Sequence, residues 1–351
     1  MNDYQIVFLM CSERSGSNLI RVMLDAHSEV FAPAPLHFVR DIGAHFHATI
    51  VRKDSSDAWG LMRTRIGNRI ERFYGKETRK MVLCEIDTIK EFSARKILKV
   101  IYETLLAGNS YKVLFIKENN IQRNLFFLLH YFPDAKFVFQ VRDPRDFLAS
   151  TKGLKSSWLG NKFGSNRRAM EVWREDQLGG LSALTHLGEE RVFLQRYEDL
   201  IAEPEKVLSK LCSFLDLEFQ QSMLDFHKKE STRLVAKQGE CWKNLQEPLM
   251  PRNLGNYKTK LSSWQVRMIE TYLGDIMECF GYQRCFLKDK EPSLFQIFWP
   301  HITEPFEKII NRNKRPFYLD GGDELWYKLE KVADPVNFPY VTSHSDINND
   351  D

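Results

Sequence analysis

Residues 8–27 read FLMCSERSGSNLIRVMLDAH and join an apolar run, a glycine turn and an amphipathic segment. This order predicts a strand, a tight turn and a helix. The first N–H groups of a helix have no partner within it and favour anions, and glycine permits the turn before them. The segment therefore predicts a phosphate-binding loop, whose binding groups are Arg14, Ser15, Gly16, Ser17 and Asn18.

The loop departs from the G-x-x-x-x-G-K-[ST] pattern of nucleotide triphosphatases. Cys11 stands at the first glycine position, Ser17 replaces the lysine, and Asn18 replaces the hydroxyl that binds Mg²⁺. Transfer of a γ-phosphate with Mg²⁺ would lack both groups. The G-x-G-x-x-G pattern of dinucleotide-binding folds is also missing from this turn. The loop therefore favours a different phosphorylated ligand.

Polar side chains follow the other predicted strands as well. Lys117 ends the run VLFIK, Arg142 ends the strand in FVFQVRDPRD, and Tyr197 follows a strand that ends near Arg196. In parallel sheets, ligands bind beside the carboxyl ends of the strands. We therefore expect these residues to meet the phosphate loop at one edge of a sheet.

The elements that would position these residues alternate along the chain. We expect strands at 6–10, 113–117, up to 142 and up to 196, and helices at 17–25, 97–106, 121–132, after Pro144 and at 204–215. Residues 31–36 are expected to form a loop, and 40–80 helices and loops. Such alternation predicts an α/β fold, with a parallel central sheet flanked by helices.

Composition limits the class of protein. The 351 residues are 43% hydrophobic and carry a net charge of +3, so a large core is possible and a nucleic-acid partner is not expected. The six cysteines are scattered and form no C-x-x-C pair, so we expect neither a zinc site nor disulfide bonds. We see no signal peptide and no run of about 20 apolar residues. A cytoplasmic protein without stable membrane insertion is the expectation.

Several motifs resemble those of sulfotransferases that use 3′-phosphoadenosine-5′-phosphosulfate. CSERSGSNLIRVMLDAHSEV is similar to their 5′-phosphosulfate loop, and most similar to the branch of tyrosylprotein and bacterial enzymes. FVFQVRDPRDFLAS resembles their 3′-phosphate motif, with Arg142 and Ser150 at the family's spacing. RYEDLIAEPEKVLSKLCSFLDLEF resembles a further family segment and would place Tyr197 near the nucleotide. The likeness covers roughly residues 4–281 and implies a P-loop-like sulfotransferase fold.

The resemblance also implies roles for single residues. Arg14 to Asn18 would hold the 5′-phosphosulfate, and Arg142 and Ser150 the 3′-phosphate. GNYKTKLSSW is similar to a late family segment, which implies that Gly255 and Lys258 contact the 3′-phosphate. Lys117 stands where the tyrosylprotein enzymes have N-K-D-P and would stabilise the leaving group. No metal is needed for this chemistry.

The general base is where this sequence departs from the tyrosylprotein enzymes. Their glutamate aligns with Ala34 and Pro35 in the loop FAPAPLHF. His37 is the nearest group that titrates near neutral pH, and many other sulfotransferases use a histidine base. We therefore assign His37 as the base, with Asp41 and Glu118 as alternatives. His27, after the first helix, is expected to be a structural cap.

The function expected is transfer of a sulfuryl group to a hydroxyl or amine of an acceptor, which we expect to be a small metabolite. The alternatives are a nucleotide or small-molecule kinase on a related core, and a nucleotide-binding protein without catalysis. We expect a sulfotransferase domain at 1–285, a Pro- and aromatic-rich extension at 286–345 packed on it, and a frayed tail at 346–351. The sequence does not indicate an oligomeric state.

Overall fold

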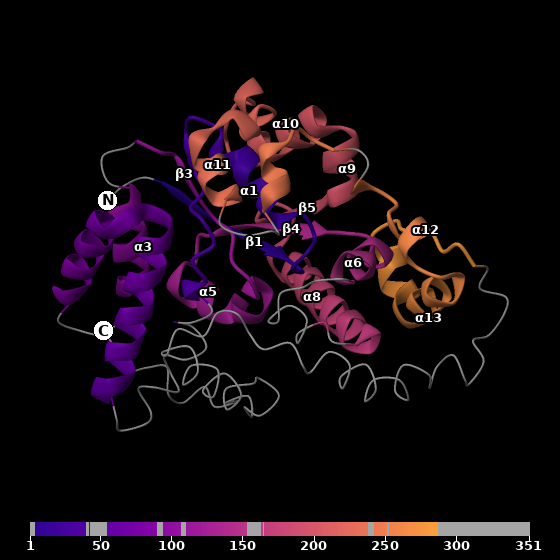
Figure 1. Ribbon diagram of the computed structural model, residues 1–351, viewed down its shortest axis with the longest axis horizontal. Helices are drawn as coiled ribbons and strands as arrows, with labels where there is room; N and C mark the ends of the chain where they lie inside the picture. The colour runs from indigo at the N-terminus through magenta and orange to yellow at the C-terminus, as the bar shows by residue number, and fades with distance from the viewer. Residues whose placement is uncertain are drawn as a thin grey trace.

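The computed structural model describes residues 4–39, 42, 55–89, 94–106, 110–152, 163, 165–237, 242–250 and 253–286. Their centre is a five-stranded sheet in the order β2-β3-β1-β4-β5, in which all neighbouring strands are parallel (Figure 1). The strands are β1 (Gln5–Cys11), β2 (Val30–Phe31), β3 (Val113–Ile116), β4 (Lys136–Val141) and β5 (Val192–Arg196). The predicted parallel α/β fold is confirmed.

Strands β1, β3 and β4 are almost continuously apolar because both faces of the sheet are covered. Along β1, Phe8 and Met10 pack into the core of one face, and Val7 and Leu9 into the core of the other. All four side chains are fully buried. The sheet is therefore a rigid base for the loops that follow its strands.

One face of the sheet packs against α1 (Ser17–Asp25), α9 (Tyr197–Ala202), α10 (Pro204–Phe214) and α11 (Glu230–Ala236). In Figure 1, α1, α10 and α11 lie above the strands. Short 3₁₀ turns join this layer, namely η2 (Gln221–Met223), η3 (Phe226–Lys228) and η4 (Lys243–Gln246). His27 is buried here, where its Nε2 lies 2.8 Å from the carbonyl oxygen of Glu218 and its Nδ1 accepts from the N–H of Glu29. His27 therefore has a structural role, as predicted, but its ring bonds to the segment around Glu218, which is far along the chain.

The opposite face carries the larger core. Its helices are α3 (Ser55–Asp87), α4 (Ala94–Leu106), α5 (Leu125–Tyr131), α6 (Pro144–Thr151), α8 (Asn166–Leu187), α12 (Tyr257–Lys260) and α13 (Ser263–Cys279), with the 3₁₀ turn η1 (Ile121–Asn124) before α5. Helix α3 is interrupted at Gly75, where φ is 86°. Figure 1 shows α5 and α8 below the strands, and α6, α12 and α13 beyond β4 and β5.

The predicted and observed elements differ mainly at boundaries. The helix expected at 97–106 begins at Ala94, and the one expected at 121–132 is a 3₁₀ turn followed by α5. The two-residue β2 lies at the start of the segment expected to be a loop. The helices α8 and α13 are not among the elements predicted from the sequence.

Some predictions concern residues outside the described part of the chain. They include Asp41, nearly all of the extension expected at 286–345, and the tail at 346–351. Within the described residues, none of the helices has the length and apolar character needed to cross a bilayer. The described cysteines Cys11, Cys84, Cys212, Cys279 and Cys285 are free thiols.

Candidate functional site

The predicted phosphate loop connects β1 to α1. Gly16 is the N-cap residue of α1 and has a left-handed φ of 82°. A Cβ atom there would lie 2.3 Å from the Tyr197 ring, so a side chain is excluded by space as well as by backbone conformation. Arg14 also has a positive φ, of 67°. The loop is thus a tight turn against the ring of Tyr197.

Two buried glutamines fix the backbone of this loop. Gln195 of β5 donates its Nε2–H to Oε1 of Gln140 in β4 at 3.0 Å, and Nε2 of Gln140 donates to the carbonyl oxygen of Ser15. That carbonyl is therefore held toward the sheet. The N–H groups in the first turn of α1 have no partner within the helix, which suits an anion.

Arg142 lies at the exit of β4, as predicted. Its Nη1–H donates to the carbonyl oxygen of Arg14 at 2.8 Å, and its guanidinium lies 4.6 Å from the centre of the Tyr197 ring. The neighbouring carboxylates of Asp143 and Asp146 bind other groups, namely Arg145 and the N–H groups of Gly255 and Tyr257. Arg142 and the phosphate loop thus form one corner.

Unpaired buried atoms at this corner fit an anionic ligand. Among the described residues, Nε of Arg14, Nε of Arg142 and Oγ of Ser15 have no hydrogen-bond partner. Buried polar atoms rarely remain unpaired in folded proteins. Two arginine donors and a hydroxyl suit the oxygens of phosphate groups, so these residues fit a phosphorylated ligand.

Residues 253–258 border the same corner. Nη2 of Arg142 lies 3.3 Å from the carbonyl oxygen of Asn253, to which it donates. Asp146, in the first turn of α6, accepts the N–H groups of Gly255 and Tyr257, each at 2.8 Å. Burial raises the pKa of Asp146, and these two donors and Arg142 oppose that rise. Gly255 has a φ of 67°, and Lys258 is exposed nearby.

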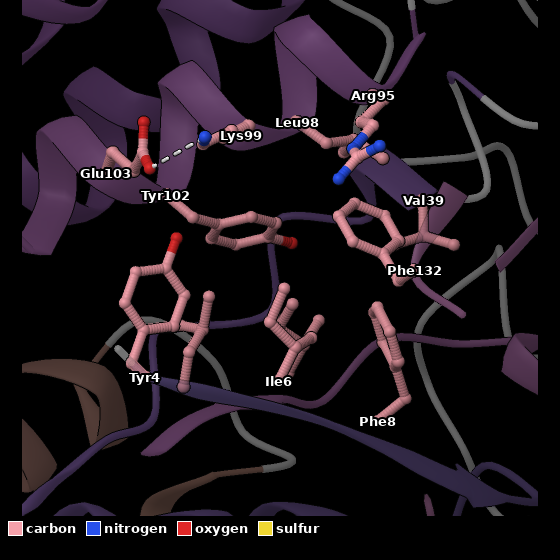
Figure 2. A pocket seen from close by; sticks show the side chains of 12 residues that line it. Tyr4, Ile6, Phe8, Val39, Arg95, Leu98, Lys99, Tyr102, Glu103 and Phe132 are labelled. Carbon is pink, nitrogen blue, oxygen red and sulfur yellow. Dashed lines mark ion pairs between the residues drawn. The ribbon is translucent and has the colours of Figure 1, made fainter. Parts of the chain in front are cut away.

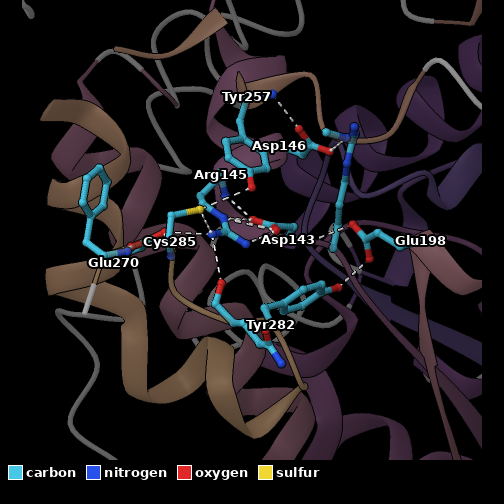
Figure 3. A network of polar contacts seen from close by, with 12 residues as sticks. Asp143, Arg145, Asp146, Glu198, Tyr257, Glu270, Tyr282 and Cys285 are labelled. Atoms are coloured by element: carbon cyan, nitrogen blue, oxygen red, sulfur yellow. Dashed lines mark hydrogen bonds and ion pairs between the residues drawn. The ribbon is translucent and has the colours of Figure 1, made fainter. Parts of the chain in front are cut away.

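A buried polar network supports this corner from behind (Figure 3). Arg145 pairs with Asp143 at 2.7 Å and with Glu270 of α13 at 2.7 Å. Glu198 accepts the N–H of Asp143 at 3.0 Å and the hydroxyl of Tyr282 at 2.6 Å. The network fixes the peptide that follows Arg142. Sequence patterns do not reveal this network, because contacts such as that of Arg145 with Glu270 join residues 125 positions apart.

Ser150 is not brought to Arg142 by any contact in the described structure. It lies near the end of α6, where its hydroxyl donates to the carbonyl oxygen of Phe147 at 2.7 Å. Its predicted contact with a 3′-phosphate remains a prediction. Binding would require that hydroxyl to exchange a helix carbonyl for the ligand.

Lys117 lies just beyond β3 and is only 6% exposed, so it is not a solvated surface lysine. Its Nζ donates to Oδ1 of Asn119 at 3.0 Å, and Nδ2 of Asn119 donates to Oε1 of Glu13 at 2.9 Å. Burial lowers the pKa of the Lys117 ammonium, and the negative charge of Glu13 opposes the change. A buried ammonium beside the phosphate loop suits an anionic partner.

The loop that carries His37 is fixed by side chains from three elements. At its start, Arg21 of α1 donates to the carbonyl oxygen of Ala32 at 2.9 Å. In the middle, the Tyr74 hydroxyl of α3 accepts the N–H of Ala34 at 2.9 Å. At its end, the Glu118 carboxylate accepts the N–H groups of Phe38 and Val39. His37 is half-buried and has a φ of 59°.

A separate apolar cavity of about 290 Å³ lies between α4 and the sheet (Figure 2). Its walls include Tyr4, Ile6, Phe8 and Tyr102, and Lys99 and Glu103 form an ion pair beside it. The cavity extends to the amino end of β1, whereas the phosphate loop and Arg142 follow the carboxyl ends of β1 and β4. We therefore keep the cavity distinct from the site at the carboxyl edge.

The fold and the phosphate loop together define a P-loop-like α/β protein whose loop lacks the triphosphatase lysine. A model of the sulfotransferase family matches residues 6–221, and the chain belongs to that family. The match spans the loop, Lys117, Arg142 and Tyr197.

The chain is similar to "Protein-tyrosine sulfotransferase" of Drosophila melanogaster, at 24% identity over 62% of this chain and 39% of that protein. It is also 23% identical to "Protein-tyrosine sulfotransferase A" of Caenorhabditis elegans, over 95% of this chain and 77% of that one. The chain therefore spans about two fifths of the length of the Drosophila relative.

Two solved structures share the fold. The sulfotransferase domain of the Synechococcus PCC 7002 olefin synthase aligns with a TM-score of 0.59 and 20% identity, over 80% of this chain and 96% of that chain. The sulfotransferase domain from the curacin biosynthetic pathway aligns with a TM-score of 0.60 and 22% identity, over 80% of this chain and 98% of that chain.

Proposed function

We propose that the protein transfers a sulfuryl group from 3′-phosphoadenosine-5′-phosphosulfate to a hydroxyl or amine of a small acceptor. The observation that carries this proposal is the corner formed by the phosphate loop, Arg142 and Tyr197. Its unpaired donors fit a nucleotide with two separate phosphate groups. Membership of the sulfotransferase family supports the transferred group.

The residues at the carboxyl edge of the sheet bind the donor and neutralise the charge that develops on it. Arg14 and the first N–H groups of α1 bind the 5′-phosphosulfate, and Arg142 binds the 3′-phosphate. When bound, the donor supplies an activated sulfuryl group whose bond to the 5′-phosphate oxygen breaks. Lys117 and Arg14 neutralise the charge that this oxygen gains, which is the main requirement of such a transfer.

His37 removes the proton of the acceptor. As the new bond to sulfur forms, the acceptor hydroxyl or amine loses a proton to the imidazole, which later releases it to solvent. Ala34 and Pro35, which stand at the glutamate position of the tyrosylprotein enzymes, offer no alternative base. Lys117 and His37 thus act on opposite ends of the reacting group.

The acceptor class is tested directly by incubation with isotope-labelled donor. We expect label in low-molecular-mass products of a metabolite extract, identified by mass spectrometry. A tyrosine-containing acidic peptide forms the second arm, because the relatives carry the name protein-tyrosine sulfotransferase. If only the peptide were labelled, the acceptor would be a protein and not a small molecule.

The base is tested in the same assay. His37→Ala should lower kcat on the order of 100-fold or more, the usual contribution of general base catalysis, and leave the donor affinity near the parent value. The affinity is measured by calorimetry with adenosine 3′,5′-bisphosphate. A variant that turns over at the parent rate would show that His37 is not the base.

A further inference from the structure

Glu118 is a buried carboxylate to which our sequence analysis gave only a reserve role. It is 1% exposed. Its Oε1 accepts the N–H of Phe38 at 2.9 Å and the hydroxyl of Tyr102 at 3.0 Å, and its Oε2 accepts the N–H of Val39 at 2.6 Å. A buried carboxylate is stable only when donors of this kind surround it. Glu118 therefore binds the backbone directly after His37.

His37 needs this support because its backbone is strained. A φ of 59° is rare for a residue other than glycine, and such residues persist where their surroundings fix them. Here the two peptide N–H groups that follow His37 are both bound by one carboxylate. The direction in which the imidazole leaves the backbone therefore depends on Glu118.

The hydroxyl of Tyr102 completes this arrangement. Burial, together with the charge of Glu118, raises the pKa of Tyr102 well above its usual value, so the hydroxyl stays protonated and donates. The ring of Tyr102 lines the apolar cavity between α4 and the sheet (Figure 2). Tyr102 thus connects α4 to the His37 loop through Glu118.

We infer that Glu118 and Tyr102 are positioning residues that set the His37 imidazole toward the acceptor. The inference rests on the proposed function of His37. Lys117 and Glu118 are neighbours directly after β3, where Lys117 bonds to Asn119 and Glu118 bonds to Tyr102 of α4 and to the His37 loop. The same strand end therefore places both the leaving-group lysine and, through the loop, the base.

The contacts also argue against Glu118 as the base itself. Both of its oxygens already accept hydrogen bonds, and the carboxylate is closed off from solvent. A general base must approach the acceptor proton within hydrogen-bond distance. Glu118 would have to release the His37 loop to do so.

The test combines two conservative variants with His37→Ala. Glu118→Gln keeps the size of the side chain but places an NH₂ group against backbone donors, and should lower kcat on the order of 100-fold. Tyr102→Phe removes only the hydroxyl, and should lower kcat about tenfold. Binding of adenosine 3′,5′-bisphosphate should stay within about twofold of the parent in both variants, because the donor corner is untouched.

Tyr4→Phe is the matched control. Tyr4 lines the same cavity, and its hydroxyl bonds to Glu103 at the amino end of the sheet, far along β1 from the site. The control removes a similar tyrosine–glutamate bond and should keep the parent kcat. Thermal unfolding of all variants shows whether their stabilities are comparable.

The decisive measurement is the double variant of Glu118→Gln and His37→Ala. If Glu118 acts through His37, the double variant has the same kcat as His37→Ala alone. A double variant whose loss of kcat equals the product of the two single losses would overturn the positioning role. So would a Glu118→Gln variant that is inactive while His37→Ala remains active. Failure of the parent protein to transfer sulfuryl groups would instead overturn the proposed function, so the two failures are distinguishable.

Discussion

The pKa of Lys117 depends on whether a negatively charged ligand lies beside it. Its ammonium is buried beside Cys11 and the chain of Asn119 and Glu13. Burial lowers its pKa, so the free protein loses this proton at a lower pH than an exposed lysine would. Cys11 shows the matching effect for an acid, since burial raises its thiol pKa to about 11. The thiol therefore stays neutral near neutral pH.

A bound anion should oppose the downward shift of the Lys117 pKa. The anion raises the lysine pKa again, so binding takes up protons in the window between the lowered free-state pKa and the higher bound-state pKa. Affinity should fall as the pH rises through the free-state pKa. Calorimetry with adenosine 3′,5′-bisphosphate in buffers of different ionisation enthalpy measures this uptake, above the phosphate pKa of about 6.

Two lysine variants complete this measurement. Lys117→Met should abolish the proton uptake and weaken binding. Lys206→Met, which removes an exposed lysine paired with Glu203, should retain both. Proton uptake that persists in Lys117→Met would assign it to another group.

Helix α6 is the element that joins the two sides of the donor corner. Asp143 caps the helix by accepting the N–H of Arg145 at 2.8 Å, and Pro144 occupies the first turn, where a missing N–H is harmless. Asp146 then holds residues 255–257 from the same turn. The helix start thus fixes the peptide behind Arg142 and the segment whose carbonyl Arg142 contacts.

Asp146→Asn should therefore loosen the donor corner. An asparagine keeps one acceptor oxygen but turns an NH₂ group toward Gly255 or Tyr257. Loss of one hydrogen bond to a charged group should weaken binding of adenosine 3′,5′-bisphosphate about tenfold, with kcat at saturating donor retained. Thr259→Val, which removes the exposed bond from Thr259 to Asn256 in the same segment, is the control and should bind normally. Parent-like affinity in Asp146→Asn would show that residues 253–258 do not contribute.

At the scale of the molecule, the sequence predicted the sheet and its exits because both depend on local patterns. Apolar runs marked four of the strands. The residues that follow β1, β4 and β5 form the corner, and Lys117 after β3 is connected through Asn119 to Glu13 of the phosphate loop. Side chains whose hydrogen bonds join different elements of the fold were not predictable from such local patterns. Gln140 is the exception that offered a signal, since a glutamine inside the apolar run KFVFQV indicates a buried hydrogen-bonding role. Glu118 gave no such sign, because its partners are fixed only once α4 and the His37 loop pack together.

The whole sheet should respond to a nucleotide that joins its strand exits. The exits of β1, β4 and β5 share one ligand corner, so binding opposes unfolding of the entire domain. At a ligand concentration 100 times Kd, adenosine 3′,5′-bisphosphate should stabilise the protein by about 2.7 kcal/mol and raise Tm by about 5 °C. Adenosine 5′-phosphate at the same concentration should raise Tm less, because it reaches only the phosphate loop.

The difference between the two nucleotides should depend on Arg142. In Arg142→Ala, both should give the same small rise in Tm, because the residue that distinguishes them is gone. In Tyr4→Phe the difference should match the parent. An Arg142→Ala variant that still prefers the bisphosphate would place the 3′-phosphate elsewhere on the protein.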